Sequence, residues 1–231
     1  MNRKVAVVGA GRMGSIVAGQ LPGDVESIVI DLNAEQARKT AEAVGAGAWS
    51  ADIADASDAD LIALVLPTPA VAPASVAAAA AAKPGAIVLN MATKGDMPPE
   101  LKTQYPDVTF ADAKIIGHAK SMRLGAPCRV ICNAEEEKDF LFIAHVLSGY
   151  ASVERGDSSL VPLINSIGSS EGVRAAVHCR KLLKQYNIPK EWEDTVIYTV
   201  CAGTMRAYAE DDLGEFARKL ADKIEAEEGI R

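Results

Sequence analysis

The feature that most constrains this chain is the stretch from Val5 to Ile16, where an apolar, β-branched run leads into three glycines and then into helix-forming sequence. The glycines follow the spacing G-x-G-x-x-G. In a strand–turn–helix unit, the first glycine permits a tight turn, the second lets backbone N–H groups approach a pyrophosphate, and the third lets the helix pack closely. The helix N-terminus then faces the anion. The pattern predicts a dinucleotide site formed by Gly9, Ala10, Gly11, Arg12, Met13 and Gly14.

A second apolar run, 27–30, ends in Asp31, at about the 20-residue interval from the first glycine that is expected for a ribose-binding acid. A carboxylate at this place accepts hydrogen bonds from the adenosine ribose and repels a 2′-phosphate. We therefore expect NAD as cofactor, with Asp31 and Asn33 in its site. Arg38 and Lys39 follow and could bind a phosphate, so NADP stays possible. The alternative for Asp31 is the N-cap of the next helix, which is compatible with a ribose contact.

Composition limits the class of protein and its partners. The chain has 231 residues, enough for one α/β domain and a smaller unit, and its 49% hydrophobic and 24% charged residues are typical of a globular protein. Aromatic residues make up only 5%, which predicts an aliphatic, alanine-rich core. The net charge of −7 disfavours nucleic acid or an anionic membrane as partner. We expect a small-molecule substrate instead.

The N-terminus and the apolar runs indicate where in the cell the protein is located, and the cysteines indicate whether it binds a metal. The first apolar run begins within four residues of Met1, which leaves no room for a signal peptide, and no apolar run reaches the ~18 residues of a membrane span. These features predict a cytoplasmic protein. The cysteines are scattered and form no CxxC pair, so we expect reduced thiols and no metal site. They are Cys128, Cys132, Cys179 and Cys201.

Strand and helix patterns alternate through the first two thirds of the chain. Strands at 4–8 and 27–30 alternate with helices at 13–21 and 34–44, an order that requires parallel strands with right-handed crossovers. The run 61–66 is continuously apolar, as in a strand buried on both faces. The fold class we predict is α/β, with an N-terminal Rossmann-type doubly wound parallel sheet. Further strands are expected near 48–50 and at 86–90, 108–111, 114–116 and 129–132, with helices at 76–82 and 135–148.

The sequence changes character after about Ser152, where strand signals become few. We predict a dinucleotide-binding domain over residues 1–152 and a smaller all-α domain for substrate binding and dimerisation over 153–231. Its helices are expected at roughly 159–186, 190–209 and 212–228, with Pro162 and Gly168 as candidate breaks in the first. Three helices would leave apolar residues such as Phe216, Leu220 and Ile224 exposed, which predicts a homodimer through the C-terminal helices.

Two segments follow the carboxyl ends of predicted strands, where ligands bind in open α/β sheets. Both segments should flank the nicotinamide, and the first consists of Leu66, Pro67 and Thr68. In the second, 90–95, Lys94 is a candidate anchor for a substrate carboxylate or carbonyl, and an ordinary surface lysine is the alternative. Thr93 or Asn90 could orient a substrate oxygen.

His118 is the best candidate for acid–base chemistry, because it alone of the three histidines follows a predicted strand beside a glycine. An imidazole with a pKa near ~6.5 can exchange the proton that accompanies hydride transfer, and Lys120 could anchor an anion. A structural histidine is the alternative. Ser169 and Ser170 belong to a small, polar run, 165–172, that opens the main helix of the second domain and would close the cleft; a helix–helix contact is the alternative.

Several of these segments resemble a known family. The motif 9–14, the strand ending at Leu66-Pro67 and the run from Asn165 to Pro189 resemble pyrroline-5-carboxylate reductases and the 6-phosphogluconate dehydrogenase-like superfamily of NAD(P)-binding oxidoreductases. The resemblance implies a Rossmann domain, a helical domain that dimerises by interlocking helices, and an active site between them. It also implies that a Ser/Gly-rich turn helps bind a cyclic imine or proline, although the run here departs from the S-G-S-G-P pattern. Residues 93–95 are similar to the T-K-G of glycerol-3-phosphate dehydrogenases, and 117–118 to the histidine loop of prephenate dehydrogenases.

Two functions from different classes follow from these observations. The first is an NAD(P)-dependent oxidoreductase that transfers a hydride between the nicotinamide and a C=O or C=N carbon of a small, carboxylated metabolite. The second is a non-enzymatic dinucleotide-sensing regulatory protein, because the glycine motif with Asp31 also resembles potassium-transport regulatory domains. The apolar helices after Ser159 favour the enzyme.

Overall fold

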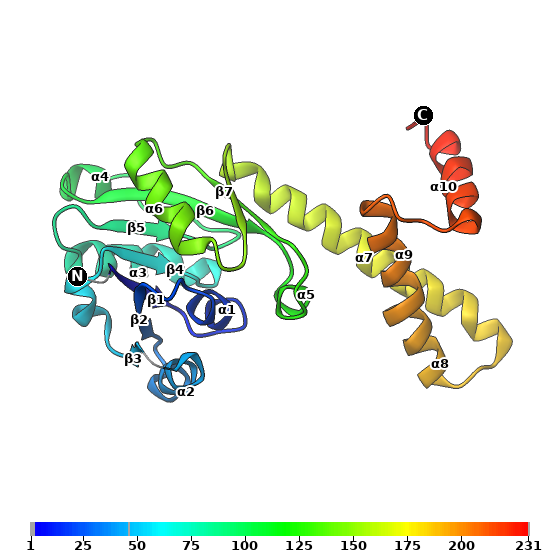
Figure 1. The fold of residues 1–231 in the computed structure, drawn as a ribbon, viewed down its shortest axis with the longest axis horizontal. Coiled ribbons are helices and arrows are strands. Elements are labelled where there is room, and N and C mark those ends of the chain that lie inside the picture. The colour runs from blue at the N-terminus through cyan, green and yellow to red at the C-terminus, as the bar shows by residue number, and fades with distance from the viewer. Residues whose placement is uncertain (1–2, 46, 231) are drawn as a thin grey trace. The chain divides into compact units, whose positions relative to one another are not determined.

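The structure, a computed structural model, describes residues 3–45 and 47–230 and forms two compact units, Met1–Asn165 and Ser166–Arg231. The first unit is an α/β fold and the second is helical where it is described (Figure 1). This confirms the predicted fold class. The two compact units meet after Asn165 in the sequence. The expected division between 152 and 153, into a cofactor domain and a substrate domain, stays a prediction.

One sheet forms the centre of the first unit. Among the described residues it has eight strands in the order β3-β2-β1-β4-β5-β6-β7-β8. All neighbours are parallel except β6 and β7, which pair antiparallel. The strands are β1 (Arg3–Val8), β2 (Val25–Ile30), β3 (Ala48–Ser50), β4 (Leu61–Leu64), β5 (Ile87–Asn90), β6 (Thr109–Ile116), β7 (Arg129–Cys132) and β8 (Ser152–Arg155).

Two strand predictions need correction. The segments expected at 108–111 and 114–116 are one strand, β6, in which Asp112 and Lys114 alternate with the core residues Ala113 and Ile115. Successive strand residues point to opposite faces, so polar residues at every second position do not interrupt a strand. The strand β8 was not predicted, because it contains one apolar residue, Val153, and is largely exposed.

Helices cover both faces of this sheet (Figure 1). Val5 and Val7 of β1 belong to the core that includes residues of α1, α2 and α6, whereas Ala6 and Val8 belong to the core that includes Ala78 of α3. The alternation of side chains along β1 therefore builds a doubly wound, three-layer unit. Its α-helices are α1 (Gly14–Gly19), α2 (Ala34–Val44), α3 (Thr68–Ala81), α4 (Leu101–Gln104), α5 (Ala119–Arg123) and α6 (Glu137–Leu147), with 3₁₀ helices at Ile53–Asp58 and Ser158–Leu160.

The second unit contains most of α7 and the helical segments that follow it. The long helix begins at Val161 and is not broken at Pro162 or Gly168, contrary to expectation. Pro162 is in the first turn, where a backbone N–H has no helical partner, and a glycine inside a helix costs only about 1 kcal/mol. The helices are α7 (Val161–Leu183), α8 (Lys190–Thr195), a π-helical turn (Val196–Cys201), α9 (Ala202–Ala209) and α10 (Glu215–Glu227), with a 3₁₀ turn at Lys184–Tyr186.

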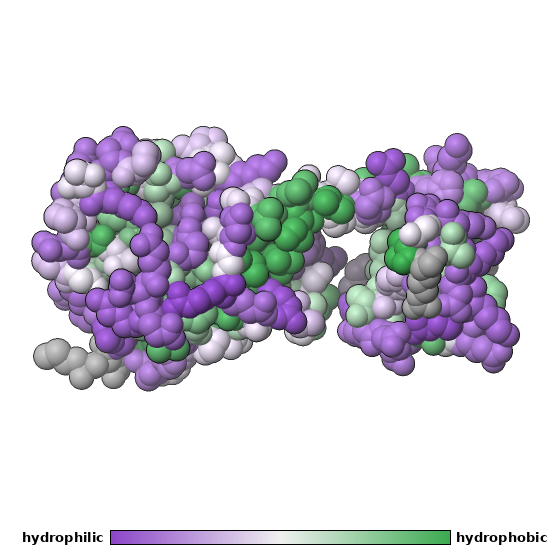
Figure 2. Space-filling view, turned by 90° about the horizontal axis from the view of Figure 1, so that it is seen from above, coloured by the Kyte–Doolittle hydropathy of each residue, from purple (hydrophilic) through white to green (hydrophobic). Residues whose placement is uncertain are grey.

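Apolar side chains are exposed on the second unit, where hydrophobic groups lie among hydrophilic ones (Figure 2). Among its described residues, only Ala221, Glu193 and Glu225 are buried. Glu225 accepts a hydrogen bond from the Tyr208 hydroxyl at 2.7 Å. Within the described ranges, no helix combines the length and the apolar character needed to cross a membrane.

Candidate functional site

A cleft of about 500 Å³ lies at the carboxyl ends of β1, β4, β5 and β6, within the first unit. The first strand pairs with β2 on one side and β4 on the other, so the chain reverses its direction of winding at β1. Such a switch point is where open α/β sheets bind ligands. The cleft is lined by Gly11, Arg12, Met13, Val65, Leu66, Pro67, Met91, Ala92, Thr93, Ile115, Gly117, His118 and Ala119.

The three glycines of the motif differ in their steric surroundings. Gly9 has φ +105°, and a Cβ atom there would lie 2.4 Å from the carbonyl oxygen of Val65. A Cβ atom at Gly14 would lie 1.7 Å from the carbonyl oxygen of Gly9, so only glycine lets α1 pack this closely. A Cβ atom at Gly11 would meet nothing within 4 Å, and Gly11 lines the cleft. The backbone at Gly11 is therefore open to a ligand.

Asp31 holds the glycine loop, which we define as Gly9–Gly14, against the end of β2. One carboxylate oxygen accepts a hydrogen bond from the Ala10 N–H at 2.7 Å, and the other accepts one from the Asn33 N–H at 2.8 Å. A carboxylate has about four acceptor positions, so about two remain for ribose hydroxyls. The N-cap of α2 is Asn33, whose side chain accepts a hydrogen bond from the Gln36 N–H at 3.1 Å. The alternative assignment of Asp31 as the cap is therefore wrong.

The two cations downstream of Asp31 are neutralised by neighbours on α2. Arg38 binds Glu35 at 2.8 Å and also Glu42, and Lys39 lies 3.4 Å from Glu35. Hydrogen bonds from Arg38 and then Lys39 lower the pKa of the Glu35 carboxyl. These ion pairs leave little positive charge to attract a 2′-phosphate.

The loops after β4 and β5 form one side of the cleft. Leu66 and Pro67 line it, whereas Thr68 begins α3 and does not. Their contact with the cofactor stays a prediction. Thr93 lines the cleft, and the next residue, Lys94, is exposed outside the lining.

Asn90 fixes the shape of the second of these loops. Its side chain is fully buried, donates to the Gly95 carbonyl at 3.0 Å and to Asp112 at 2.8 Å, and accepts from the Ala92 N–H at 3.1 Å. The prediction that Asn90 could orient a substrate oxygen is therefore wrong. The same bonds place Ala92 and Thr93 along the cleft.

His118 lies at the other side of the cleft, exposed, immediately before α5. Its carbonyl accepts a hydrogen bond from the Met122 N–H at 2.9 Å, which closes the first turn of that helix. Gly117 is packed tightly, since a Cβ atom there would lie 3.0 Å from Cβ of Cys128. The backbone that carries His118 is thus well supported. Lys120 is exposed on α5 and does not line the cleft.

The small, polar run at 165–172 is part of α7 rather than a turn that opens it, which corrects the expectation. Asn165 donates a side-chain hydrogen bond to the carbonyl of Ile115, a cleft residue, at 2.8 Å. Ser169 and Ser170 are exposed in the second unit, on a face of α7 that also carries Arg174. Their role in closing a cleft stays a prediction.

Arg123 is a residue near the site that the sequence did not reveal. Its guanidinium donates to the Arg12 carbonyl at 3.1 Å and to the Ser15 hydroxyl at 2.9 Å. These residues are more than 100 positions apart, and no local pattern pairs them.

The cysteines lie apart from the cleft lining. All four are free; Cys128 and Cys132 are buried, and burial raises the pKa of both thiols. In the part of the chain that the structure describes, no three His, Cys, Asp or Glu residues are grouped to hold a metal ion.

The strand order, the glycine loop and the acid after β2 define the first unit as a Rossmann-type dinucleotide-binding fold. Residues 4–94 match the model of a family described as NADP oxidoreductase coenzyme F420-dependent. No curated protein sequence matches the chain significantly.

Solved structures confirm the fold over nearly the whole chain. A pyrroline-5-carboxylate reductase from Coxiella burnetii is 15% identical, with a TM-score of 0.71 over 97% of this chain and 85% of the reductase. A 3-hydroxyisobutyrate dehydrogenase from Salmonella typhimurium is 23% identical, with a TM-score of 0.67 over 91% of this chain and 79% of the dehydrogenase. A reductive aminase from Aspergillus terreus, solved with NADPH and ethyl levulinate, is 21% identical, with a TM-score of 0.64 over 96% of this chain and 79% of the aminase. The chain therefore shares the fold of these NAD(P)-dependent reductases and dehydrogenases.

Proposed function

We propose that this protein is an NAD(P)-dependent oxidoreductase that transfers a hydride between the nicotinamide and a C=O or C=N carbon of a small, carboxylated metabolite. The observation that carries the proposal is one cleft that has the glycine loop on one side and His118 on the other. The likeness to a pyrroline-5-carboxylate reductase, a hydroxyacid dehydrogenase and a reductive aminase supports the same class of reaction.

The residues present fit a dinucleotide. Gly11 leaves its backbone open to the cleft, and the close packing of Gly9 and Gly14 holds the loop in that shape. Asp31 keeps acceptor capacity for ribose hydroxyls beside the loop. When bound, the nicotinamide supplies or accepts the hydride, which is chemistry that protein side chains lack.

The chain's own residues bind the substrate and move the proton. We assign His118 to donate a proton to the substrate oxygen or nitrogen during reduction, because it is the one imidazole in the cleft lining. Lys94 and Lys120 are exposed beside the cleft loops and are assigned to attract a substrate carboxylate. Ser169 and Ser170 are assigned to contact the substrate from the helical unit. The predicted division into a cofactor domain and a substrate domain is part of this proposal.

The cofactor is tested by calorimetric titration with NADH and NADPH. We expect tighter NADH binding, because Asp31 repels a 2′-phosphate and Arg38 is held by Glu35 and Glu42. Asp31→Ser should narrow the difference between the two cofactors by about tenfold, which corresponds to about 1.4 kcal/mol. Asp24→Ser, before the opposite end of β2, is the control and should leave the ratio unchanged. Tighter binding of NADPH by the unmodified protein would reverse the assignment.

The reaction is tested by screening small keto acids and cyclic imines for oxidation of NADH, followed by its absorbance. We expect turnover with at least one carboxylated compound and little with its ester. Tight NADH binding without turnover of any compound would favour the dinucleotide-sensing regulator.

The assembly is also part of the proposal: a homodimer through the C-terminal helices, whose exposed apolar residues need a partner surface. The expected location in the cytoplasm stays a prediction, and cell fractionation tests it.

A further inference from the structure

Two of the segments that line the candidate cleft, which we call its first and second walls, come from distant parts of the chain. The first wall is the segment 11–13 of the glycine loop, and the second is the segment 117–119, which we call the His118 loop. A cofactor that reaches from the glycine loop to His118 would contact both walls. Their spacing therefore determines whether the two halves of the cofactor fit at once.

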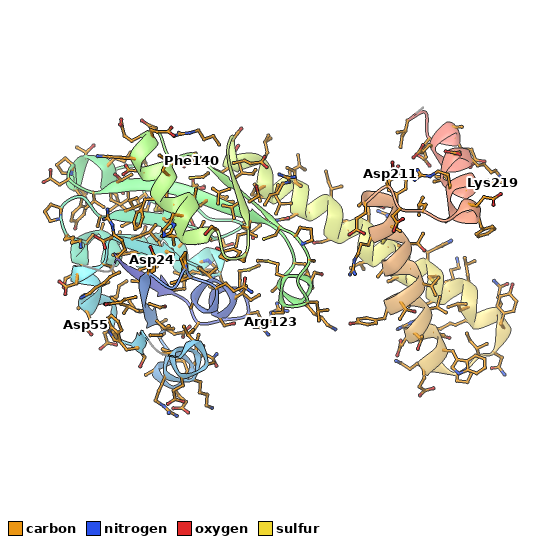
Figure 3. The ribbon with its side chains drawn as sticks, viewed as in Figure 1. Asp24, Asp55, Arg123, Phe140, Asp211 and Lys219 are labelled. Carbon is orange, nitrogen blue, oxygen red and sulfur yellow. The ribbon has the colours of Figure 1, made fainter. Side chains whose placement is uncertain are left out.

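Arg123, labelled in Figure 3, links the helix that follows the second wall to the first wall. From the last residue of α5, its guanidinium donates to the carbonyl of Arg12, within the first wall, at 3.1 Å. It also donates at 2.9 Å to the hydroxyl of Ser15, which itself donates to the same Arg12 carbonyl at 3.2 Å. The planar guanidinium can hold two acceptors in a fixed geometry, which a lysine ammonium does less well.

The helix that carries Arg123 is anchored independently of this contact. Met122 is 5% exposed and belongs to the core of the first unit. The backbone after the helix closes through a hydrogen bond from the Ala126 N–H to the Ser121 carbonyl at 3.0 Å, and Gly125 there has φ +81°. A supported helix therefore holds the outward-pointing Arg123, which in turn holds the glycine loop.

We propose that Arg123 is a positioning residue that sets the width of the cofactor cleft by fixing the glycine loop to the His118 loop. The inference rests on the proposed binding of a dinucleotide. Arg123 acts through Arg12 and Ser15 and is not assigned a contact with the cofactor.

A ligand series separates this role from a general loss of stability. ADP contains the pyrophosphate but no nicotinamide, so it needs only the first wall, whereas NADH needs both. Arg123→Ala should weaken NADH binding by about 3- to 10-fold, the range expected for lost hydrogen bonds, and ADP binding by less than about 2-fold. Arg123→Lys, which keeps one donor group, should recover part of the NADH affinity.

Two further variants control the experiment. Arg129→Ala removes another exposed arginine of the first unit, one bound to Glu154 of the neighbouring strand, and should leave NADH affinity unchanged. The double variant Ser15→Ala with Arg123→Ala should lose less NADH binding free energy than the sum of the losses in the two single variants, because both side chains bind the Arg12 carbonyl.

The outcomes distinguish this inference from the proposed function. Unchanged NADH affinity in Arg123→Ala, or equal weakening of NADH and ADP, would overturn the positioning role. If the unmodified protein binds neither ligand, the proposed function fails; hydrogen exchange of the ligand-free protein then tests the contact itself. Arg123→Ala should speed amide exchange at Ser15 and Met122, and unchanged exchange would show that Arg123 fixes neither segment.

Discussion

The two units of this protein bury their apolar residues to very different extents. In the first unit, the side chains of β4 are all 0% exposed, covered on both faces of the sheet. In the second unit, Phe216 is 83% exposed and Val177 is 65% exposed, and two of the three buried residues among those described are glutamates. The first unit therefore contains a complete core. The second has apolar faces that its own helices do not cover.

This difference indicates where each unit obtains its stability. Burying a large apolar side chain stabilises a fold by about 1.5–3 kcal/mol. The exposed apolar side chains of the second unit do not contribute this stabilisation within a single chain. Extended apolar surface on a protein marks an interface. We therefore propose that the unit with its own core carries the cofactor chemistry and that the unit with uncovered apolar faces carries the assembly surface.

The largest expected effect tests where the chemistry resides. His118→Ala should lower kcat by about 10²–10⁴-fold with NADH affinity nearly unchanged, because a general acid contributes about that factor. Ser169→Ala in the second unit should mainly raise KM, by less than about 10-fold. Both are measured by steady-state kinetics on a substrate from the screen. His145→Ala, an exposed histidine paired with Asp24 at 3.1 Å, is the control. Wild-type turnover in His118→Ala would show that solvent or a hydroxyl supplies the proton.

A pair of glycine variants compares the packing of the two units. Gly14→Ala should destabilise the first unit by about 2–3 kcal/mol and abolish NADH binding, because its Cβ would lie 1.7 Å from the Gly9 carbonyl oxygen. Gly168→Ala, with no atom within 4 Å of the added Cβ, should stabilise α7 by up to about 1 kcal/mol. Urea unfolding is followed at Trp49 for the first unit and Trp192 for the second. A loss of stability in Gly168→Ala would show that another surface packs on that face.

The exposed apolar residues of α10, which are Phe216, Leu220 and Ile224, give the next test. Light scattering should give about twice the chain mass for the unmodified protein, and Leu220→Asp should shift it toward the monomer, because a buried charge opposes the apolar contact. Lys219→Asp changes the adjacent residue, which binds Glu215 at 2.7 Å on the charged side of α10, and should leave the mass unchanged (Figure 3). A monomeric unmodified protein would remove the argument that the second unit is an assembly surface.

The smallest effect concerns acid stability. Burial raises the pKa of Asp60, but hydrogen bonds from the Lys4 N–H at 2.9 Å and from Lys83 at 2.9 Å outweigh it, so the pKa is lowered overall. Its stabilisation is therefore present above the unfolded-state pKa of about 3.9 and is lost as the pH falls through the folded-state pKa. Asp60→Asn should cost about 1 kcal/mol at pH 7 and less near pH 3, measured by urea unfolding.

Asp194 is the matched carboxylate in the second unit. The hydrogen bond from Lys190 lowers its pKa, but the group is exposed and solvent screens it. Asp194→Asn should leave unfolding nearly unchanged at both pH values. An equal loss in both variants would contradict the expectation that the partly buried Asp60 stabilises its unit more than the exposed Asp194 does.

Much of the fold could be predicted because its signals are local. The strand β7 was expected at 129–132 and is found there, and the run beginning at Leu61 is the buried β4. The steric role of Gly14 follows from the motif alone, since a Cβ atom there would meet the carbonyl oxygen of Gly9, five positions earlier. Such features depend on neighbours within about 20 residues, so one sequence contains their full pattern.

The tertiary structure alone decided which of these segments meet. Nothing in the sequence shows that β7 pairs antiparallel to β6 or that Arg123 binds Arg12. Nor does it show that the Asn90 side chain donates its hydrogen bonds to Gly95 and Asp112. Each of these depends on how the chain folds back on itself, because Asn90 and Asp112 are 22 positions apart and Arg12 and Arg123 are 111 positions apart. The sequence gives the chemical character of each side chain. The hydrogen bonds that the side chain makes depend on the donors and acceptors that the packed sheet places beside it.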